Sequence, residues 1–168
     1  MAAAQPDIFS GQDFSLLRDK NRFVLPPQFR RTLRALNNDT PSMLLLMHDE
    51  WPCLVGFAHS RVQQLEAEID AEADLAARAG REFDREERSL ELYAYEPVPF
   101  DNSGRFVLPE TLAIPAEIED QVFFRGGGKF FTIWAPHQLE TMDDVKIWKN
   151  AKIVCRALAK KALEKAGK

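Results

Sequence analysis

One pentapeptide occurs twice in this chain of 168 residues. Arg-Phe-Val-Leu-Pro stands at residues 22–26 and again at residues 105–109. The similarity continues downstream, where residues 53–58 (CLVGFA) align with residues 130–135 (FFTIWA). Matches that keep the same order on both sides of a motif indicate an internal duplication, here of roughly fifty residues per copy. Two such copies are expected to pack around a pseudo-twofold axis.

The composition suits one compact domain, and its charges are segregated. A chain of 168 residues with 45% hydrophobic residues can bury about 70% of its unfolded surface. The net charge of −4 argues against a generic nucleic-acid binder. However, residues 10–36 and 143–168 are rich in lysine and arginine, whereas residues 59–99 are rich in acids. This asymmetry, more than the net charge, is expected to decide which partner the chain binds.

The sequence contains no sign of export, of a membrane span or of a metal site. The N-terminus lacks the basic and apolar regions of a signal peptide, and the longest apolar run, residues 43–47, is too short to cross a bilayer. Cys53 and Cys155 have neither the number nor the spacing of a disulfide framework or a zinc site, and the three histidines share no ligand spacing. A cytoplasmic protein without metal, cofactor or membrane partner is therefore predicted.

The order of apolar stretches and turns predicts an α+β fold in four parts. After a loose arm at residues 1–7, the parts are a first strand-and-helix repeat at residues 8–58, connecting helices at 59–90, a second repeat at 91–135 and a helical region at 136–168. In the first repeat, the polar turn at residues 18–21 is expected to join two strands of a hairpin. In the second repeat, residues 91–98 are expected to form the first strand.

The C-terminal region is expected to form a basic amphipathic helix over residues 143–168. Its expected apolar side consists of Val145, Trp148, Ile153, Val154 and Leu158. Three roles stay open for this helix: accessory contact with DNA, packing or assembly, and a mobile tail.

The second copy of the pentapeptide follows the turn Asp101-Asn102-Ser103-Gly104. An Asp that opens a tight turn accepts backbone N–H bonds, and a Gly supplies the positive φ that the turn needs. Arg105 comes next and begins a strand, so its side chain is expected to project from the tip of the turn. Arginine suits phosphates and guanine edges because its guanidinium is a planar fork of donors.

The segment FDNSGRFVLP, together with FFTIW and the doubled layout, resembles the MraZ proteins. These bacterial transcriptional regulators are built from two SpoVT/AbrB-type swapped-hairpin halves. The family signature in each half is Asp-x-x-Gly-Arg, followed by an apolar strand and Pro. The segment IFSG at residues 8–11 also resembles the Phe-x-Gly motif near the N-terminus of the family's proteins. The whole resemblance extends over about residues 8–142.

The resemblance implies that two β-hairpin/helix halves form a swapped-hairpin β-barrel. It implies a nucleoid-associated repressor that binds repeated short boxes upstream of the division and cell-wall gene cluster, and a homo-oligomeric ring whose turns line one face. The expected partners are therefore double-stranded promoter DNA and further copies of the chain. Arg22 and Arg105 are the expected DNA contacts, while Asp101 and Gly104 are expected to hold and orient the second turn.

The first turn departs from the family signature. Aligned on Arg22, the usual Asp is Arg18 and the usual Gly is Asn21, while Lys20 keeps a basic residue. Asn tolerates a left-handed backbone better than most residues, so the turn is still expected to form. The lost carboxylate and the added cation favour general attraction to phosphates over base specificity. Arg18, Lys20 and Asn21 therefore join the predicted DNA contacts.

Several alternatives compete with this interpretation. The cations could form a solvated basic face, or the chain could be an antitoxin-like interaction protein that acts mainly through protein partners. RGGGK at residues 125–129 resembles a phosphate-binding loop, but such a loop leads into a helix. Here the expected strand at Phe130 and Phe131 follows, so a glycine hairpin turn is predicted. No nucleophile–base pair is visible, and neither an enzyme nor a small-molecule substrate is predicted.

Overall fold

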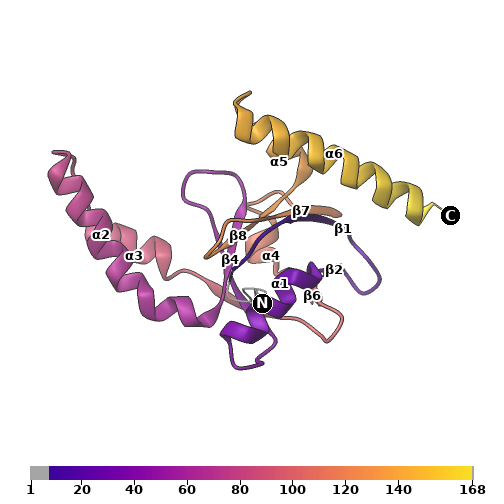
Figure 1. Cartoon of the computed structure of the whole chain (residues 1–168), viewed down its shortest axis with the longest axis horizontal. Coiled ribbons are helices and arrows are strands. Elements are labelled where there is room, and N and C mark those ends of the chain that lie inside the picture. The colour runs from indigo at the N-terminus through magenta and orange to yellow at the C-terminus, as the bar shows by residue number, and fades with distance from the viewer. Residues whose placement is uncertain (1–7, 168) are drawn as a thin grey trace, which may run out of the picture.

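The computed structural model describes residues 8–167, so the arm expected at residues 1–7 lies outside the described residues. Pairs of short strands alternate with helices along the chain (Figure 1), and the α+β class predicted from the sequence is confirmed. In chain order the elements are β1 (Gln12–Leu16), β2 (Arg22–Val24), α1 (Pro27–Leu36), β3 (Ser42–Met47), β4 (Leu54–Phe57), the 3-10 helix η1 (His59–Gln64), α2 (Leu65–Arg78), α3 (Arg85–Leu92), β5 (Glu96–Pro99), β6 (Arg105–Val107), α4 (Glu110–Ala113), β7 (Gln121–Gly126), β8 (Phe131–Trp134), α5 (Pro136–Glu140) and α6 (Lys146–Ala166).

The strands form two antiparallel sheets that mix the two halves of the chain. The larger sheet has the order β1-β7-β8-β4-β3-β5, and the smaller one is a ribbon of β2 and β6. In the ribbon Phe23 lies opposite Phe106, and in the larger sheet Val55 lies opposite Thr132. At both places a strand of one copy of the repeat pairs with the corresponding strand of the other copy. The pairs are antiparallel, as a pseudo-twofold axis requires.

The hairpin predicted from β1 and β2 forms only at its turn. The backbone N–H of Arg18 donates to the carbonyl of Arg22 at 2.7 Å, which closes the turn. Beyond this bridge, β1 pairs with β7 and β2 pairs with β6. An isolated two-stranded hairpin is marginally stable, and β1 instead joins a sheet of six strands. Both strands are therefore held by partners from the second half of the chain.

The strand expected at residues 91–98 starts later than predicted, because α3 continues to Leu92 and β5 begins at Glu96. Two contacts hold this segment in a helix. The carboxylate of Asp84 accepts the backbone N–H of Glu87 at the N-terminus of α3. The guanidinium of Arg88 donates to both carboxylate oxygens of Glu72 on α2, at 2.7 and 3.0 Å. The paired helices α2 and α3 project together from the sheet (Figure 1).

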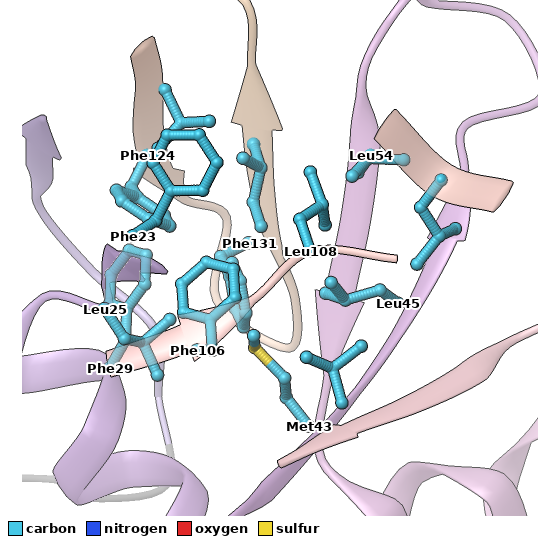
Figure 2. Close-up of a cluster of buried hydrophobic side chains, with 14 of the residues drawn as sticks. Phe23, Leu25, Phe29, Met43, Leu45, Leu54, Phe106, Leu108, Phe124 and Phe131 are labelled. Carbon is cyan, nitrogen blue, oxygen red and sulfur yellow. The ribbon is translucent and has the colours of Figure 1, made fainter. Parts of the chain in front are cut away.

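Both faces of the larger sheet are covered. One face packs against α1, α4 and the ribbon, in the cluster that Figure 2 shows. All the core residues predicted from the repeat are buried there, namely Phe23, Leu25, Phe29, Phe106, Leu108 and Leu112. The other face carries Trp134, whose ring lies 5.3 Å from that of Trp148 on α6. The sheet therefore holds the ribbon on one side and the C-terminal helix on the other.

The apolar side of α6 agrees in part with the predicted one. Trp148 is buried as expected, and Val154 and Leu158 pack against the same cluster of side chains. Val145, which lies just before the helix, and Ile153 are 51% and 60% exposed. The buried positions are Trp148, Ala151, Lys152 and Cys155. The small residues at 151 and 155 allow the helix to approach the sheet closely. Lys152 can lie among them because its ammonium donates to the carbonyl of Met142 at 2.6 Å.

Gly56 supports a close approach between β4 and β8. It lies opposite Phe131, and a Cβ added at Gly56 would overlap the ring of Phe131. That ring is fully buried and its centroid lies 4.9 Å from the ring of Phe29. We expect Gly56→Ala to lower the free energy of unfolding by about 1–3 kcal/mol, because overpacking displaces a side chain that the core surrounds. Urea denaturation measures this change.

The control for this substitution is Gly167→Ala, where the nearest atom to an added Cβ is the Leu163 carbonyl oxygen at 3.5 Å. The control is expected to stay within about 0.5 kcal/mol of the parent. Equal unfolding midpoints for Gly56→Ala and the parent chain would contradict the packing role of Gly56.

Candidate nucleic-acid interface

The two arginines of the repeated pentapeptide lie on the outer face of the β2–β6 ribbon. Side chains alternate along a strand, so Phe23 and Phe106 enter the core and are 2% exposed. Arg22 and Arg105 are therefore on the opposite face of the ribbon. Because the strands are antiparallel, each arginine stands at the beginning of its own strand, beside the end of the other strand.

The first and second turns border one shallow depression on this face. Its lining includes Arg18, Asp19 and Arg22 from the first turn and Ser103 and Arg105 from the second. The structure thus brings three of the predicted DNA contacts, Arg18, Arg22 and Arg105, around one surface. The other two predicted contacts, Lys20 and Asn21, are exposed at the tip of the first turn.

Asp101 organises the second turn through both of its carboxylate oxygens. Oδ1 accepts the backbone N–H groups of Ser103 and Arg105, each at 2.9 Å. Oδ2 accepts the Nε–H of Arg105 at 2.7 Å and lies 3.9 Å from Nη1 of Arg22. Desolvation alone would raise the pKa of Asp101, but the hydrogen bonds from Arg105 and Ser103 outweigh it, so the pKa lies below its usual range. The carboxylate is therefore ionised at neutral pH and aligns the guanidinium of Arg105.

Gly104 is the position where the second turn meets the end of β2. Its φ of 83° lies in the left-handed region, and a Cβ there would come within 2.9 Å of the Leu25 carbonyl oxygen. The Leu25 N–H in turn donates to the Gly104 carbonyl at 2.8 Å. Glycine is thus required by the backbone conformation and by the space available.

Helix α1 also holds the second turn, through two arginines that lie outside the repeated motif and were not predicted as site residues. Arg30 Nη1 donates to the Asn102 carbonyl at 3.3 Å, and Arg34 Nη2 donates to Asn102 Oδ1 at 3.0 Å. Their spacing of four residues on one helix, directly after the first pentapeptide, is the signal that could have identified them, since such residues share a face. In the alignment of the repeats, the corresponding residues are Ala113 and Glu117. Neither offers a guanidinium to the first turn.

The first turn has a different construction. Lys20 and Asn21 both adopt left-handed backbone, with φ of 62° and 56°. This conformation costs a residue such as lysine about 1–2 kcal/mol and asparagine less. Nε of Arg22 donates to the Asp19 backbone carbonyl at 3.2 Å. The corresponding Nε of Arg105 donates instead to the carboxylate of Asp101. The first turn is therefore richer in positive charge and has fewer contacts that determine its shape.

The glycine-rich segment RGGGK forms a hairpin turn, as predicted. Strand β7 ends at Gly126, the N–H of Gly127 donates to the Phe130 carbonyl at 2.8 Å, and β8 follows at Phe131. No helix starts there to receive a phosphate. Among residues 8–167, no three His, Cys, Asp or Glu side chains gather in a way that could hold a metal ion. Within the same residues, no helix has the length and apolar content that a membrane crossing needs.

Known proteins with similar sequences identify the family of this chain. No family model matches it. The transcriptional regulator MraZ of Gluconacetobacter diazotrophicus, however, is 31% identical over 134 residues, which cover 79% of this chain and 82% of the relative. The chain belongs to the MraZ family. The MraZ regulator of Rhodospirillum rubrum is also 31% identical, over 83% of this chain and 86% of its own length. That of Gluconobacter oxydans is 30% identical over 131 residues.

Membership in the MraZ family confirms the resemblance carried by the second turn and the doubled layout. MraZ proteins are transcriptional regulators and not enzymes, so the chain is a regulator of transcription. The matches cover about four fifths of the chain, and the arginine-bearing ribbon is its feature that suits contact with nucleic acid.

The hydrogen bonds of Asp101 predict a pH-dependent contribution to stability. We expect Asp101→Asn to lower the free energy of unfolding at pH 7 by about 1 kcal/mol, because the amide cannot replace the charged acceptor of Arg105. The folded-state pKa lies below the unfolded value of about 3.9. The contribution is therefore complete above about pH 5 and is lost as the pH falls past the unfolded value and through the folded-state pKa. Urea denaturation of both proteins at pH 7 and pH 3 measures the difference.

Asp143→Asn is the matched control, because Asp143 is exposed and belongs to none of the ion pairs among residues 8–167. It is expected to change stability by less than about 0.5 kcal/mol at both pH values. A destabilisation by Asp101→Asn that persists or grows at pH 3 would show that the carboxylate does not act through its charge.

Proposed function

We propose that this MraZ protein represses transcription by binding duplex promoter DNA with both turns at once. The observation that carries the proposal is the pairing of β2 with β6, which places Arg18, Arg22 and Arg105 around one depression. Three guanidinium groups on one exposed face attract the phosphates of a duplex and displace their condensed counterions. The family resemblance supports repeated short boxes upstream of the division and cell-wall genes as the target, and the nucleoid in the cytoplasm as the place of action.

The two turns are proposed to divide the recognition of DNA. Asp101 engages Arg105 through Nε, which leaves the two terminal nitrogens of the guanidinium to form a bidentate contact with a guanine. Since Asp101, Gly104 and the arginines of α1 determine this turn, Arg105 is the residue proposed to read base sequence. Arg22, together with Arg18, Lys20 and Asn21, is proposed to bind phosphates.

The fold that presents these turns is proposed to be a swapped-hairpin β-barrel made of two repeats. The proposed parts are the repeats 8–58 and 91–135, the connecting helices 59–90 and the C-terminal helical region 136–168. The strand order supports this arrangement. Strands β1, β3 and β4 of the first repeat correspond to β5, β7 and β8 of the second. The order of corresponding strands is therefore the same from either edge of the larger sheet. The two outer strands β1 and β5 each lead into one of the turns, and each pairs with the other half of the chain.

The DNA-binding experiment compares the chain's own upstream promoter fragment with a random duplex of equal length, by fluorescence anisotropy across a range of salt concentrations. The parent protein is expected to prefer the promoter and to lose affinity steeply as salt rises. Arg105→Ala is expected to lose about 1–3 kcal/mol of discrimination between the two duplexes. Arg22→Ala is expected to weaken binding to both duplexes alike. It is also expected to reduce the slope of log affinity against log salt concentration, the salt slope, by about one.

Arg81→Ala serves as the matched control, because Arg81 is exposed between α2 and α3, away from the ribbon. It removes the same charge and is expected to leave both affinities unchanged. Equal loss of discrimination from Arg22→Ala and Arg105→Ala would refute the division between the turns. A parent protein with no salt-sensitive binding to the promoter would refute the function and favour a regulator that acts through protein partners.

A closed homo-oligomer, in the form of a ring, is proposed as the functional assembly. Each copy offers one small basic face, and several weak contacts on repeated boxes gain avidity through effective concentration. The projecting pair of helices supports assembly, because Leu75 on α2 and Leu90 on α3 are 58% and 76% exposed. Light scattering at micromolar concentration is expected to give a multiple of the chain mass of 19.2 kDa. A mass equal to that of one chain would contradict the proposal.

A further inference from the structure

A second depression begins at Arg18 and runs between β1 and the C-terminal half of α6. Its apolar floor includes Phe14 of β1 and Leu158 of α6. The charged residues of its lining are three cations, Arg18, Lys161 and Lys165, and one carboxylate, Asp13. We call it the α6 groove. Arg18 also lines the depression between the two turns. The α6 groove is therefore continuous with the face proposed to bind DNA, and Figure 1 shows the C-terminal end of α6 on the same side as the loop that joins β1 to β2.

We propose that the α6 groove binds the phosphate backbone of the same duplex, through Lys161 and Lys165, next to the phosphates bound by the first turn. This inference rests on the function proposed above and extends its surface to a helix outside the two repeats. The two lysines are four residues apart, so they lie about 6 Å apart along one face of the helix. A duplex carries one negative charge for about every 1.7 Å of its length, so both ammonium groups can reach phosphates.

The charges along α6 support this use of its last turns. In the middle of the helix the cations have partners within the chain: Arg156 forms two hydrogen bonds with the Glu140 carboxylate, at 2.7 and 2.6 Å, and Lys152 lies 3.6 Å from Asp144. The salt bridges within residues 8–167 include neither Lys161 nor Lys165. Together with Arg18 these lysines outnumber Asp13, the carboxylate in the lining of the groove, so the groove attracts an anionic partner.

The position of α6 also explains why the extension belongs to the first turn. Helix α6 packs along β1, the strand that leads into this turn. The helix that follows the strands of the first repeat, α2, packs instead against α3 and projects away from the sheet (Figure 1). The second turn thus has Asp101 and the arginines of α1 to determine its shape. The first turn has fewer such contacts and gains additional phosphate-binding charge from α6.

The test compares two double variants of α6 in the full chain. Lys161→Ala/Lys165→Ala removes the two groove lysines, and Lys146→Ala/Lys149→Ala removes two exposed lysines from the other end of the same helix. Binding to the promoter duplex is measured by anisotropy across salt. The groove variant is expected to reduce the salt slope, that is, the slope of log affinity against log salt concentration, by about 1.8. If the affinities of variant and parent converge at 1 M salt, this change corresponds to roughly 60-fold weaker binding at 0.1 M salt. The ratio of promoter to random affinity is expected to stay unchanged.

The control variant is expected to keep the parent salt slope, and thermal melts are expected to match the parent for both variants because all four side chains are exposed. An unchanged slope in the groove variant, or equal losses in both variants, would overturn the inference while parent binding still supports the proposed function. A groove variant with altered mass in light scattering and parental DNA binding would assign the groove to contacts between copies and also overturn it. Absence of DNA binding by the parent would overturn both proposals.

Discussion

The pairing of the repeated pentapeptide with itself is the contact on which the rest of this structure depends. Phe23 and Phe106 lie opposite one another at its centre, with ring centroids 6.1 Å apart, and both rings are buried. Strands of three residues are too short to be stable as an isolated ribbon. They persist because their inner side chains belong to a core that both halves of the chain supply. The outer side chains, Arg22 and Arg105, are thereby held on one face.

The same pairing explains how nearly identical strands carry two different turns. The Gly104 carbonyl and the Leu25 N–H join the second turn to the end of β2, and Arg30 and Arg34 reach this turn from α1. A helix of the first half thus determines a turn of the second half. The reciprocal contact is missing because the corresponding positions are Ala113, at the end of α4, and Glu117, beyond that helix. A scaffold with corresponding strands in both halves thus carries an asymmetric surface.

Local features of the fold could be predicted from the sequence, and long-range partners could not. The left-handed Gly104, the glycine turn before Phe131 and the buried Phe23 and Phe106 follow from residue type and spacing, and the structure has all of them. The pairing of β1 with β7 depends on a register between distant segments, which periodicity does not encode. The spacing of Arg30 and Arg34 predicts that they share one face of α1, but their contact with the second turn depends on the same long-range pairing.

The central claim is that both turns contact one DNA duplex. Hydrogen–deuterium exchange of the full chain, with and without its promoter fragment, tests it most directly. The account predicts slower exchange in peptides that cover residues 17–24 and 100–107, with protection rising at the same DNA concentration in both. Protection of only one turn, or of the α2–α3 pair with both turns unchanged, would contradict it.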